Sequence, residues 1–573
     1  MQPVRLMVGL LAFTALLAAQ RFDVVEATIP QMRDAMAQGK VTSRELVVAY
    51  LGRIATYENQ LHAAITVNPR ALQEAEARDA ERVQGRVRGP LHGIPIAIKD
   101  NILTNDIVTT GGALVFAGFI PPYDATLVKN LRDAGAVIIA KTNLSEWAGW
   151  LSSAPSAVPG NYTGVRGYGY NPYDPRKDPR PGYQDGRPVM NTGGSSSGAG
   201  TTTSFWAANV GTETSGSILN PANQNMLAAI KPTVGRVSRW GVIPVTLDQD
   251  TAGPMGRTMT DAAILLGALE SPRPDPNDPA TTTCALTPNR DYTVFLKADG
   301  LKGVRIGIPR AFFFNPATPP GATAPRGGLA PEQAKLMAEA IAIMKSQGAI
   351  IVDPADLPSV VDKDPARNVL NFFFCAAINQ AKGKDANCSV DLKYGMKRDF
   401  NKWLATLGST APVKTLTELR NWNNAHITQG AIRYGQFTLD ISDEMDLEAD
   451  KARYEADRKK DIDLAGTHGI DEVMKANRLD AILFPGSTGT TIVDKPGYPS
   501  VIVPFGMVPN RPTGQFGGVA TAPGPDFPKG FNARPAPYGV SFAGAACSEG
   551  KLIQIGYAFE QASKRRVPPP NLP

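Results

Sequence analysis

The chain has 573 residues, of which 43% are hydrophobic and 20% are charged, as in a globular protein with a substantial core. Its 55 glycines and 48 prolines indicate many turns but fall short of a disordered composition. The net charge of +6 is small for this length and no nucleic-acid-binding motif is present, so we expect no nucleic-acid partner. The length allows several domains or one large α/β domain with additional segments.

Histidine and cysteine are scarce, with four residues of each. The sequence contains no H-E-x-x-H motif and no C-x-x-C pair, so zinc and iron–sulfur sites are not expected. We therefore predict neither a metal ion nor an organic cofactor. Cys375 and Cys388 are the closest cysteines in sequence, and they could form a disulfide in an oxidising compartment.

The N-terminus has the features of a secretory signal peptide. Arg5 precedes an apolar run from Leu6 to Ala19 that ends in small residues. This run is shorter than the roughly 20 residues that a membrane span needs, and no later segment is long and apolar enough. We predict a signal over residues 1–19, export to the periplasm or the medium, and a single domain over residues 23–573. A retained membrane anchor or a buried first helix is the alternative.

Three helices are predicted next. The first runs from Ile29 to Gln38 and is ended by Gly39. Thr42 and Glu45 form a capping box that opens the second helix. A third helix is predicted over residues 68–84, because the proline near its start suits the first helical position.

Strands and helices then alternate along the chain. A strand over residues 94–98, a helix over 125–134 and a strand over 136–140 predict a parallel strand–helix–strand unit. Such alternation predicts a layered α/β fold. The same pattern returns with strands at 304–308, 349–352 and 481–484 and with helices at 331–347 and 552–562.

Residues 151–192 interrupt this pattern. The segment is crowded with proline, glycine and tyrosine and has almost no apolar periodicity. We predict a long loop inserted in the domain. A loop of this length is either functional or an ordered excursion over the surface.

Two glycine- and serine-rich segments, 193–198 and 211–218, are the most unusual feature of the sequence. A flexible linker has this composition, but both segments lie between apolar stretches. A serine hydroxyl needs a neighbouring base to act as a nucleophile, and a neutral lysine can replace histidine. Lys99 ends the apolar strand at 94–98, so burial could lower its pKa. Glycine N–H groups beside the serine could form an oxyanion hole.

These segments resemble the amidase signature family, whose members use a Ser–cis-Ser–Lys triad. The resemblance covers about residues 27–568, and its motifs occur in the order that the family shows. Besides the two serine segments, the matching motifs are His92-Gly93-Ile94-Pro95, Lys99-Asp100-Asn101, Asp124-Ala125-Thr126, residues 141–146, residues 231–235, residues 250–255, residues 497–504 and residues 558–561.

The resemblance implies a single large α/β domain whose mixed, twisted central sheet is covered by helices on both faces. It implies that Ser217 is the nucleophile that forms an acyl-enzyme, and that Ser195, with a cis peptide bond, is the bridging serine. Lys99 is then the neutral lysine that takes the proton through Ser195. The oxyanion would be held by the backbone N–H groups of Thr214, Ser215, Gly216 and Ser217.

The sequence departs from the family pattern in two ways. Ser215 occupies a position where the family usually has glycine or aspartate, although its N–H can still donate. Ser195 and Ser217 are also slightly closer in sequence than is usual, and we place the shortening in a helix between Gly198 and Val210. This spacing leaves Ser196 as an alternative bridging residue, whereas the preceding Gly-Gly pair favours Ser195.

Within the family, the chain is most similar to exported peptide amidases, which remove the C-terminal amide of peptides. The shared features are the signal peptide, Ser145-Glu146-Trp147 and Gly211-Thr212-Glu213-Thr214. We therefore predict an exported serine amidohydrolase that converts a small-molecule or peptide amide to an acid plus ammonia or an amine. Aryl amides, carbamates and esters are alternative substrates. A cytoplasmic transfer-RNA amidotransferase subunit is a further alternative, which the signal peptide disfavours.

Two other interpretations are open. Residues 194–198 match the G-x-S-x-G elbow of α/β-hydrolases, with Ser196 as nucleophile and His426 or His468 as base, but the residues before them make a poor strand. A secreted binding protein that has lost turnover is the alternative from another class. The joint presence of the three triad residues disfavours it.

Overall fold

The computed structural model describes residues 22–153, 157–385, 387–510, 514–516, 519–521, 525–570 and 572. The signal peptide predicted over residues 1–19 lies outside the described residues. Within the described ranges, no helix has both the length and the apolar character needed to cross a membrane.

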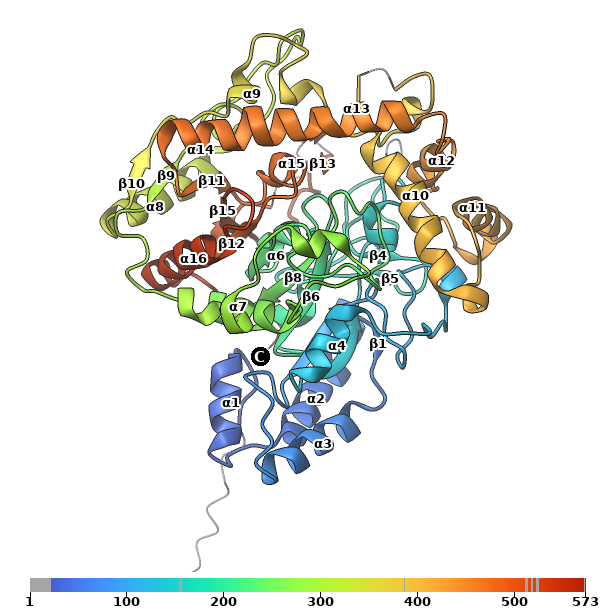
Figure 1. Cartoon of the computed structure of the whole chain (residues 1–573), viewed down its shortest axis with the longest axis vertical. Helices are drawn as coiled ribbons and strands as arrows, with labels where there is room; N and C mark the ends of the chain where they lie inside the picture. The colour runs from blue at the N-terminus through green and yellow to red at the C-terminus, as the bar shows by residue number, and fades with distance from the viewer. Residues whose placement is uncertain are drawn as a thin grey trace, which may run out of the picture.

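A mixed sheet of 11 strands lies at the centre of the described chain (Figure 1). In spatial order the strands are β1 (Ala64–Val67), β3 (Val137–Thr142), β2 (Pro95–Lys99), β6 (Ala208–Glu213), β8 (Thr251–Gly256), β7 (Ala228–Lys231), β12 (Ser500–Val508), β15 (Ala536–Ala543), β11 (Ala481–Pro485), β9 (Arg305–Gly307) and β10 (Ile350–Val352). β2 is parallel to β3 and β6, and β9 is parallel to β10 and β11, whereas the other neighbours are antiparallel. The predicted α/β fold with a mixed central sheet is confirmed.

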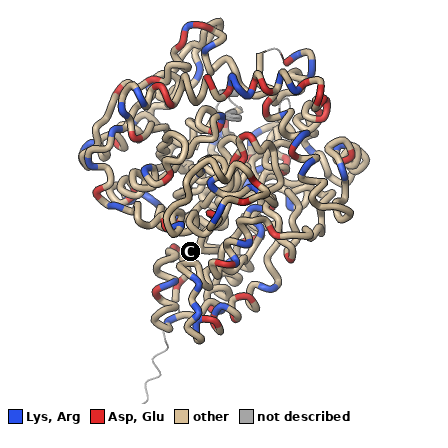
Figure 2. Tube along the Cα trace, viewed as in Figure 1, with Lys and Arg blue, Asp and Glu red and all other residues tan. Residues whose placement is uncertain are grey.

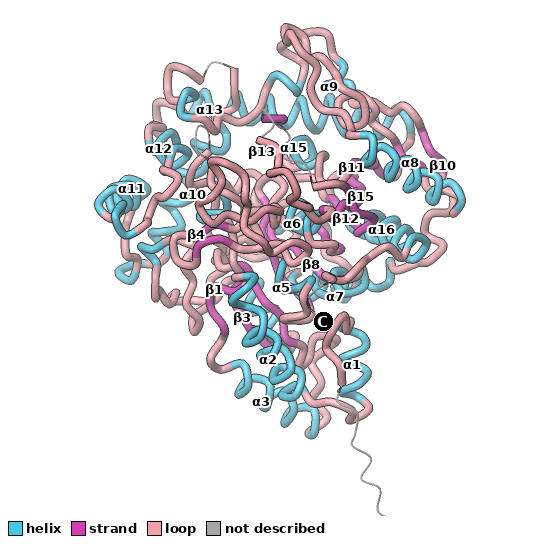
Figure 3. Tube along the Cα trace, turned by 180° about the vertical axis from the view of Figure 1, so that it is seen from behind, coloured by secondary structure: helices cyan, strands magenta, loops and turns pink. Residues whose placement is uncertain are grey.

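Helices flank this sheet, and the view from behind shows the strands in the interior (Figure 3). The helices are α1 (Ile29–Ala37), α2 (Ser43–Leu61), α3 (Ala71–Val83), α4 (Thr126–Asp133), α5 (Ala199–Thr202), α6 (Leu219–Gln224), α7 (Met259–Leu269), α8 (Pro331–Ser346), α9 (Pro358–Val361), α10 (Asp391–Thr406), α11 (Leu416–Ala425), α12 (Phe437–Asp443), α13 (Lys451–Ile462), α14 (Glu472–Asn477), α15 (Thr490–Val493) and α16 (Glu549–Ser563). α7 packs on β7 and β8, and α16 packs on β12 and β15. A π-helical segment joins α13 to α14, so the two cross the top of Figure 1 as one long helix.

The strand–helix–strand unit predicted over residues 94–140 is confirmed, with α4 between the parallel strands β2 and β3. Every residue of both strands is buried, as expected for parallel strands covered on both faces. The capping box of Thr42 and Glu45 is also confirmed, at the start of α2. The third helix begins at Ala71 instead of residue 68, because the Asn68 side chain accepts the Arg70 N–H and shapes a turn after β1.

The helix expected between Gly198 and Val210 is wrong. Only the short α5 is helical there, and the chain then turns through Ser204, whose φ is 55°, into β6. The indole of Trp206 packs so closely on Gly200 of α5 that a Cβ there would lie 2.0 Å from the ring.

Residues 157–192 form an excursion with little regular structure beyond the hairpin of β4 (Tyr162–Thr163) and β5 (Gly167–Tyr168). Buried tyrosines of the hairpin pack on Tyr434, in an aromatic cluster that also takes in α10. Each of three Asp-x-Arg sequences in the excursion closes an ion pair within itself. These pairs join Asp174 to Arg176, Asp178 to Arg180 and Asp185 to Arg187.

Charged residues of both signs are interspersed along the described trace (Figure 2). Many are paired across the fold, as Arg132 is with Asp106 and Arg398 with Asp248. In this view neither sign dominates a face.

Two disulfides link the described chain. Cys375 and Cys388, whose pairing the sequence left open, form a disulfide that closes a short loop with a sequence separation of 13. Cys284 and Cys547 form the second pair across a separation of 263 residues, and no local pattern could have indicated it. The second disulfide ties the loop after α7 to the segment that leads into α16.

We expect the long-range disulfide to contribute more stability than the short one. Closing a loop of about 15 residues is worth about 3 kcal/mol in the chain-entropy model and a loop of 100 residues about 4.7 kcal/mol, so the 263-residue separation should exceed both. The double variant Cys284→Ser/Cys547→Ser should therefore melt at a lower temperature than Cys375→Ser/Cys388→Ser. Thermal unfolding of both variants checks the order. Free thiols in the denatured, unreduced wild-type protein would contradict the pairing itself.

Candidate active site

The carboxyl end of β2 carries Lys99 into the interior. Because β2 and β6 are parallel neighbours, their carboxyl ends meet and Lys99 lies beside Thr212. Lys99 is fully buried, and its Nζ is 2.8 Å from Ser195 Oγ, 2.9 Å from Thr212 Oγ1 and 3.3 Å from the Thr212 carbonyl oxygen. Asn101 Nδ2 also donates to Thr212 Oγ1, at 3.0 Å, and so fixes the hydroxyl beside the lysine.

Burial lowers the pKa of Lys99 to about 7, because desolvation disfavours the charged ammonium. The carboxyl groups of Asp250 and Glu213 oppose this shift. Burial also raises the pKa of Asp250 to about 7, which weakens its negative charge near neutral pH. A lysine with this pKa is partly neutral at pH 7 and then has a lone pair that accepts a proton.

Ser195 lies in a tight turn before α5. The expected cis peptide bond between Gly194 and Ser195 is confirmed. The Ser195 carbonyl accepts the Ser145 N–H at 2.8 Å, and the residue is only 4% exposed. Gly193 has φ 73°, and a Cβ there would lie 2.5 Å from the Pro221 Cα, so this turn requires glycine.

Ser217 lies in the loop between β6 and α6 and is 7% exposed. The preceding Gly216 has φ 83°, a backbone conformation that favours glycine. The Ser217 carbonyl accepts the Ser196 N–H at 3.2 Å. This hydrogen bond places the two serine segments side by side, with Lys99 against the first of them.

Two buried carboxyl groups accept hydrogen bonds from backbone N–H groups of the Ser217 loop. Glu213 Oε2 accepts the N–H groups of residues 218–219 at 2.5 and 2.9 Å. Asp494 Oδ2 accepts the Gly216 N–H at 2.9 Å, and Lys231 Nζ lies 3.1 Å from Asp494 Oδ1. Burial and the neighbouring Glu213 carboxyl raise the pKa of Asp494, and the charge of Lys231 opposes this shift.

The amides predicted to bind an oxyanion are therefore not equivalent. The Gly216 N–H is already bound by Asp494. The N–H groups of Thr214, Ser215 and Ser217 have no hydrogen-bond partner within the part of the chain that the structure describes. Those three remain available to a ligand.

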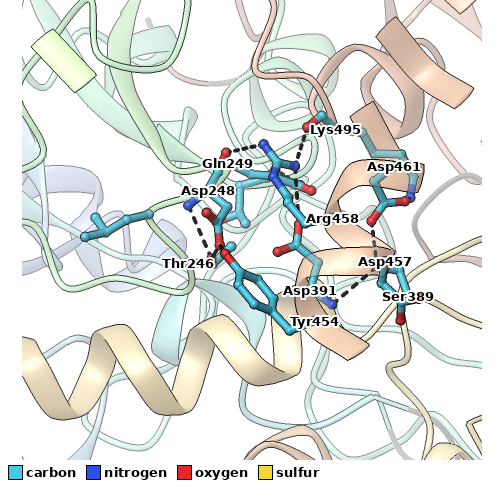
Figure 4. A network of polar contacts seen from close by, with 12 residues as sticks. Thr246, Asp248, Gln249, Ser389, Asp391, Tyr454, Asp457, Arg458, Asp461 and Lys495 are labelled. Atoms are coloured by element: carbon cyan, nitrogen blue, oxygen red, sulfur yellow. Dashed lines mark hydrogen bonds and ion pairs between the residues drawn. The ribbon is translucent and has the colours of Figure 1, made fainter. Parts of the chain in front are cut away.

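A second layer of polar contacts ties this loop to α13 (Figure 4). Gln249 Nε2 donates to the Thr214 carbonyl at 3.0 Å. Arg458 of α13 donates to the carbonyl of Asp248 at 2.9 Å and to the carbonyl of Lys495 at 2.6 Å. Asp248 directly precedes Gln249, and Lys495 directly follows Asp494, whose carboxyl group accepts the Gly216 N–H. One guanidinium thus joins the two segments that contact the loop.

The alternative with Ser196 as nucleophile does not fit this geometry. Ser196 is fully buried, and its Oγ donates to the Thr212 carbonyl at 3.0 Å and accepts the Thr212 N–H at 3.1 Å. His468 pairs with carboxylates elsewhere, and His426 stacks on Trp422. Neither imidazole is a hydrogen-bond partner of Ser196 in the described ranges, and the residues before it form no strand.

Sequence reasoning missed three residues of this site as individual contributors. Thr212 and Asp250 lie within motifs that carry the family resemblance, but the sequence did not indicate which contacts they make. Asp494 contacts Gly216 across a separation of 278 residues, and nothing in the sequence around it indicates the contact.

Residues 45–553 match the family model described as Amidase. A probable amidase of Arabidopsis thaliana is 33% identical over 555 residues, which cover 96% of this chain and 92% of that protein. The native peptide amidase from Stenotrophomonas maltophilia gives a TM-score of 0.76 at 34% identity, over 95% of this chain and 98% of that one. A structure of a peptide amidase in complex with the competitive inhibitor chymostatin also gives a TM-score of 0.76 at 34% identity, over 96% and 100% of the two chains.

Proposed function

The chain belongs to the amidase signature family, and we propose that it hydrolyses a carboxamide through an acyl-enzyme formed on Ser217. One observation carries the mechanism. Buried Lys99 has its Nζ 2.8 Å from Ser195 Oγ, and the Ser195 and Ser217 segments lie side by side. A base, a bridging hydroxyl and a nucleophile thus occur in one buried site.

In the proposed first step, neutral Lys99 accepts the Ser195 hydroxyl proton while Ser195 takes the proton of Ser217. Ser217 Oγ forms a bond to the carbonyl carbon, which gives a tetrahedral intermediate with a negative oxygen. Lys99 then returns a proton to Ser195, Ser195 gives its proton to the leaving nitrogen, the C–N bond breaks, and ammonia or an amine departs. Water attacks the acyl-Ser217 ester in the same way and releases the acid.

We assign the negative oxygen of the intermediate to the N–H groups of Thr214, Ser215 and Ser217. These amides are unengaged within the described ranges, whereas the Gly216 N–H binds Asp494. Preorganised N–H donors in a buried site stabilise developing charge strongly, because they need no reorganisation during the reaction.

As substrate we propose the C-terminal amide of a peptide. The support is the likeness to peptide amidase at 34% identity, together with a peptide amidase structure that contains the competitive inhibitor chymostatin. Aryl amides, carbamates and esters could pass through the same steps and are the second group of candidates.

Ser217→Ala is expected to abolish turnover, because no other described hydroxyl replaces its Oγ. Lys99→Ala should lower amide hydrolysis by about 10²–10⁴-fold, the usual contribution of a general acid–base group. Ser215→Ala, in the same loop, keeps its backbone N–H and should stay within about threefold of wild type. The measurements are ammonia release from a C-terminally amidated dipeptide and peptide mapping after a serine-directed fluorophosphonate probe.

The outcomes separate mechanism from substrate. Labelling at Ser217 without ammonia release would keep the mechanism and move the substrate to aryl amides, carbamates or esters. Labelling at Ser196, or normal turnover by Ser217→Ala, would contradict the assignment of roles. A wild-type protein that neither labels nor hydrolyses any of these compounds would favour the alternative of a binding protein.

The pH profile should follow Lys99, whose pKa burial lowers to about 7. Only the neutral lysine accepts a proton, so kcat/KM should fall about tenfold per pH unit below this value and level off above it. The Asp250 carboxylate raises the Lys99 pKa, so Asp250→Asn should move the acidic limb to lower pH. A wild-type kcat/KM that does not fall below the Lys99 pKa would contradict Lys99 as the titrating group.

We further propose that the protein acts outside the cytoplasm. Both disulfides, Cys284–Cys547 and Cys375–Cys388, are of the kind that persists in an oxidising compartment. The signal peptide predicted over residues 1–19 would also direct the protein out of the cytoplasm. N-terminal sequencing of the protein from the periplasm or the medium tests this, and recovery only from the cytoplasm with an intact N-terminus would refute it.

A further inference from the structure

The excursion over residues 157–192 contacts the turn that contains Ser195 through the side chains of Asn191, Thr192 and Asn161, and Asn161 alone of these reaches both ends of the turn. Asn161 is fully buried and lies just before β4. Its φ is 57°, in the left-handed region that asparagine tolerates better than most residues. Asparagine therefore suits this position better than most other residues would.

The Asn161 side chain contacts both ends of the turn that contains Ser195. Nδ2 donates to the Gly193 carbonyl at 3.0 Å and to the Ser196 carbonyl at 3.1 Å. One of these carbonyls precedes Ser195 in the chain and the other follows it. A single amide group thus fixes the two flanks of the residue whose hydroxyl meets Lys99.

Asn161 is itself held in place by backbone contacts. Its N–H donates to Ser145 Oγ at 3.0 Å, and its carbonyl accepts the Gly169 N–H at 2.7 Å. The Ser145 N–H in turn donates to the Ser195 carbonyl at 2.8 Å. The preceding Gly160 packs so closely that a Cβ would lie 2.7 Å from the Gly193 carbonyl oxygen. The excursion and the Ser195 turn are interlocked.

We propose that Asn161 is a positioning residue for Ser195. It holds the flanking carbonyls so that Ser195 Oγ stays within hydrogen-bond distance of Lys99 Nζ, at 2.8 Å. This inference rests on the proposed function, in which Ser195 carries the proton between Lys99, Ser217 and the leaving nitrogen. An aspartate at position 161 would turn a carboxylate oxygen toward two carbonyl oxygens and repel both.

The same excursion offers a matched control in Asn171. Asn171 is also fully buried, and its Nδ2 also donates to two backbone carbonyls, those of Asn191 and Gln224, each at 2.9 Å. Its Oδ1 accepts the Tyr173 N–H at 3.0 Å. These contacts do not include the turn of residues 193–196. Loss of Asn171 therefore removes an equivalent set of hydrogen bonds without touching Ser195.

The experiment compares Asn161→Asp and Asn161→Ala with Asn171→Asp and Asn171→Ala in the full chain. Two substrates with the same acyl group are used, a peptide amide and a 4-nitrophenyl ester. Both substrates need Ser195 to take the Ser217 proton, but the amide also needs a proton delivered to its leaving nitrogen, whereas 4-nitrophenolate leaves without one. Misplacement of a catalytic group by about 1 Å can cost about 100-fold in rate.

We expect the Asn161 variants to lose about 100-fold in kcat for the amide, with KM changed less than about threefold and with a much smaller loss for the ester. The Asn171 variants should keep the wild-type ratio of amide to ester hydrolysis. Equal losses for amide and ester, or equal effects of the two asparagines, would overturn the inference and leave Asn161 with a packing role.

If Asn161→Asp does not fold, as judged by its thermal transition, Ser145→Ala provides a milder change. That variant removes only the oxygen that accepts the Asn161 N–H and should lower the amide-to-ester ratio in the same direction. A ratio unchanged from wild type would count against the inference. Fluorophosphonate labelling and turnover of wild type separate the two proposals: a wild-type protein that neither labels on Ser217 nor hydrolyses either substrate refutes the proposed function and the inference with it. A labelled wild type with unaffected Asn161 variants refutes the inference alone.

Discussion

The rest of the site depends on the burial of the Lys99 side chain at the end of β2. A pKa lowered from 10.5 to about 7 corresponds to roughly 5 kcal/mol of lost stabilisation of the ammonium form. The folded domain must offset this cost through its packing elsewhere. The parallel pairing of β2 with β6 makes the arrangement possible, because it brings the lysine beside Thr212 and the two serine segments. Asp250 and Glu213 oppose the shift and keep the pKa near neutral pH.

The nucleophile loop is short, but distant parts of the chain hold it. Asp494 binds its Gly216 N–H, and Gln249 binds its Thr214 carbonyl. Arg458 of α13 joins the two segments from which these contacts come. The long helix that crosses the top of Figure 1 thus takes part in the geometry of the site without reaching its reacting atoms. Such second-layer contacts hold catalytic groups within the narrow limits that reaction requires.

The excursion has a comparable relation to the bridging serine. Its own ion pairs and the packing of its tyrosines on Tyr434 make it a supported part of the domain. Asn161 belongs to this segment, and its side chain donates to the carbonyl groups of Gly193 and Ser196 on either side of Ser195. A segment that composition alone would class as a loop therefore has a rigid attachment to the site.

The sequence by itself determined the residue types and the class of fold. Buried parallel strands appear in a sequence as short continuous apolar runs, whereas flanking helices show apolar residues at helical spacing. The alternation of strands and helices could therefore be predicted from the sequence. The serine and lysine motifs resemble those of the amidase signature family, and this resemblance predicted Lys99, Ser195 and Ser217 as the triad. The helix expected between Gly198 and Val210 is limited to the short α5, because the chain turns through Ser204 into β6. Only the tertiary structure decided that Asp494 engages Gly216, that Cys284 pairs with Cys547 and that Asn161 brackets Ser195. These contacts join residues that are far apart in the chain or that lie in unusual backbone turns. The local periodicity of a sequence carries no information about such contacts.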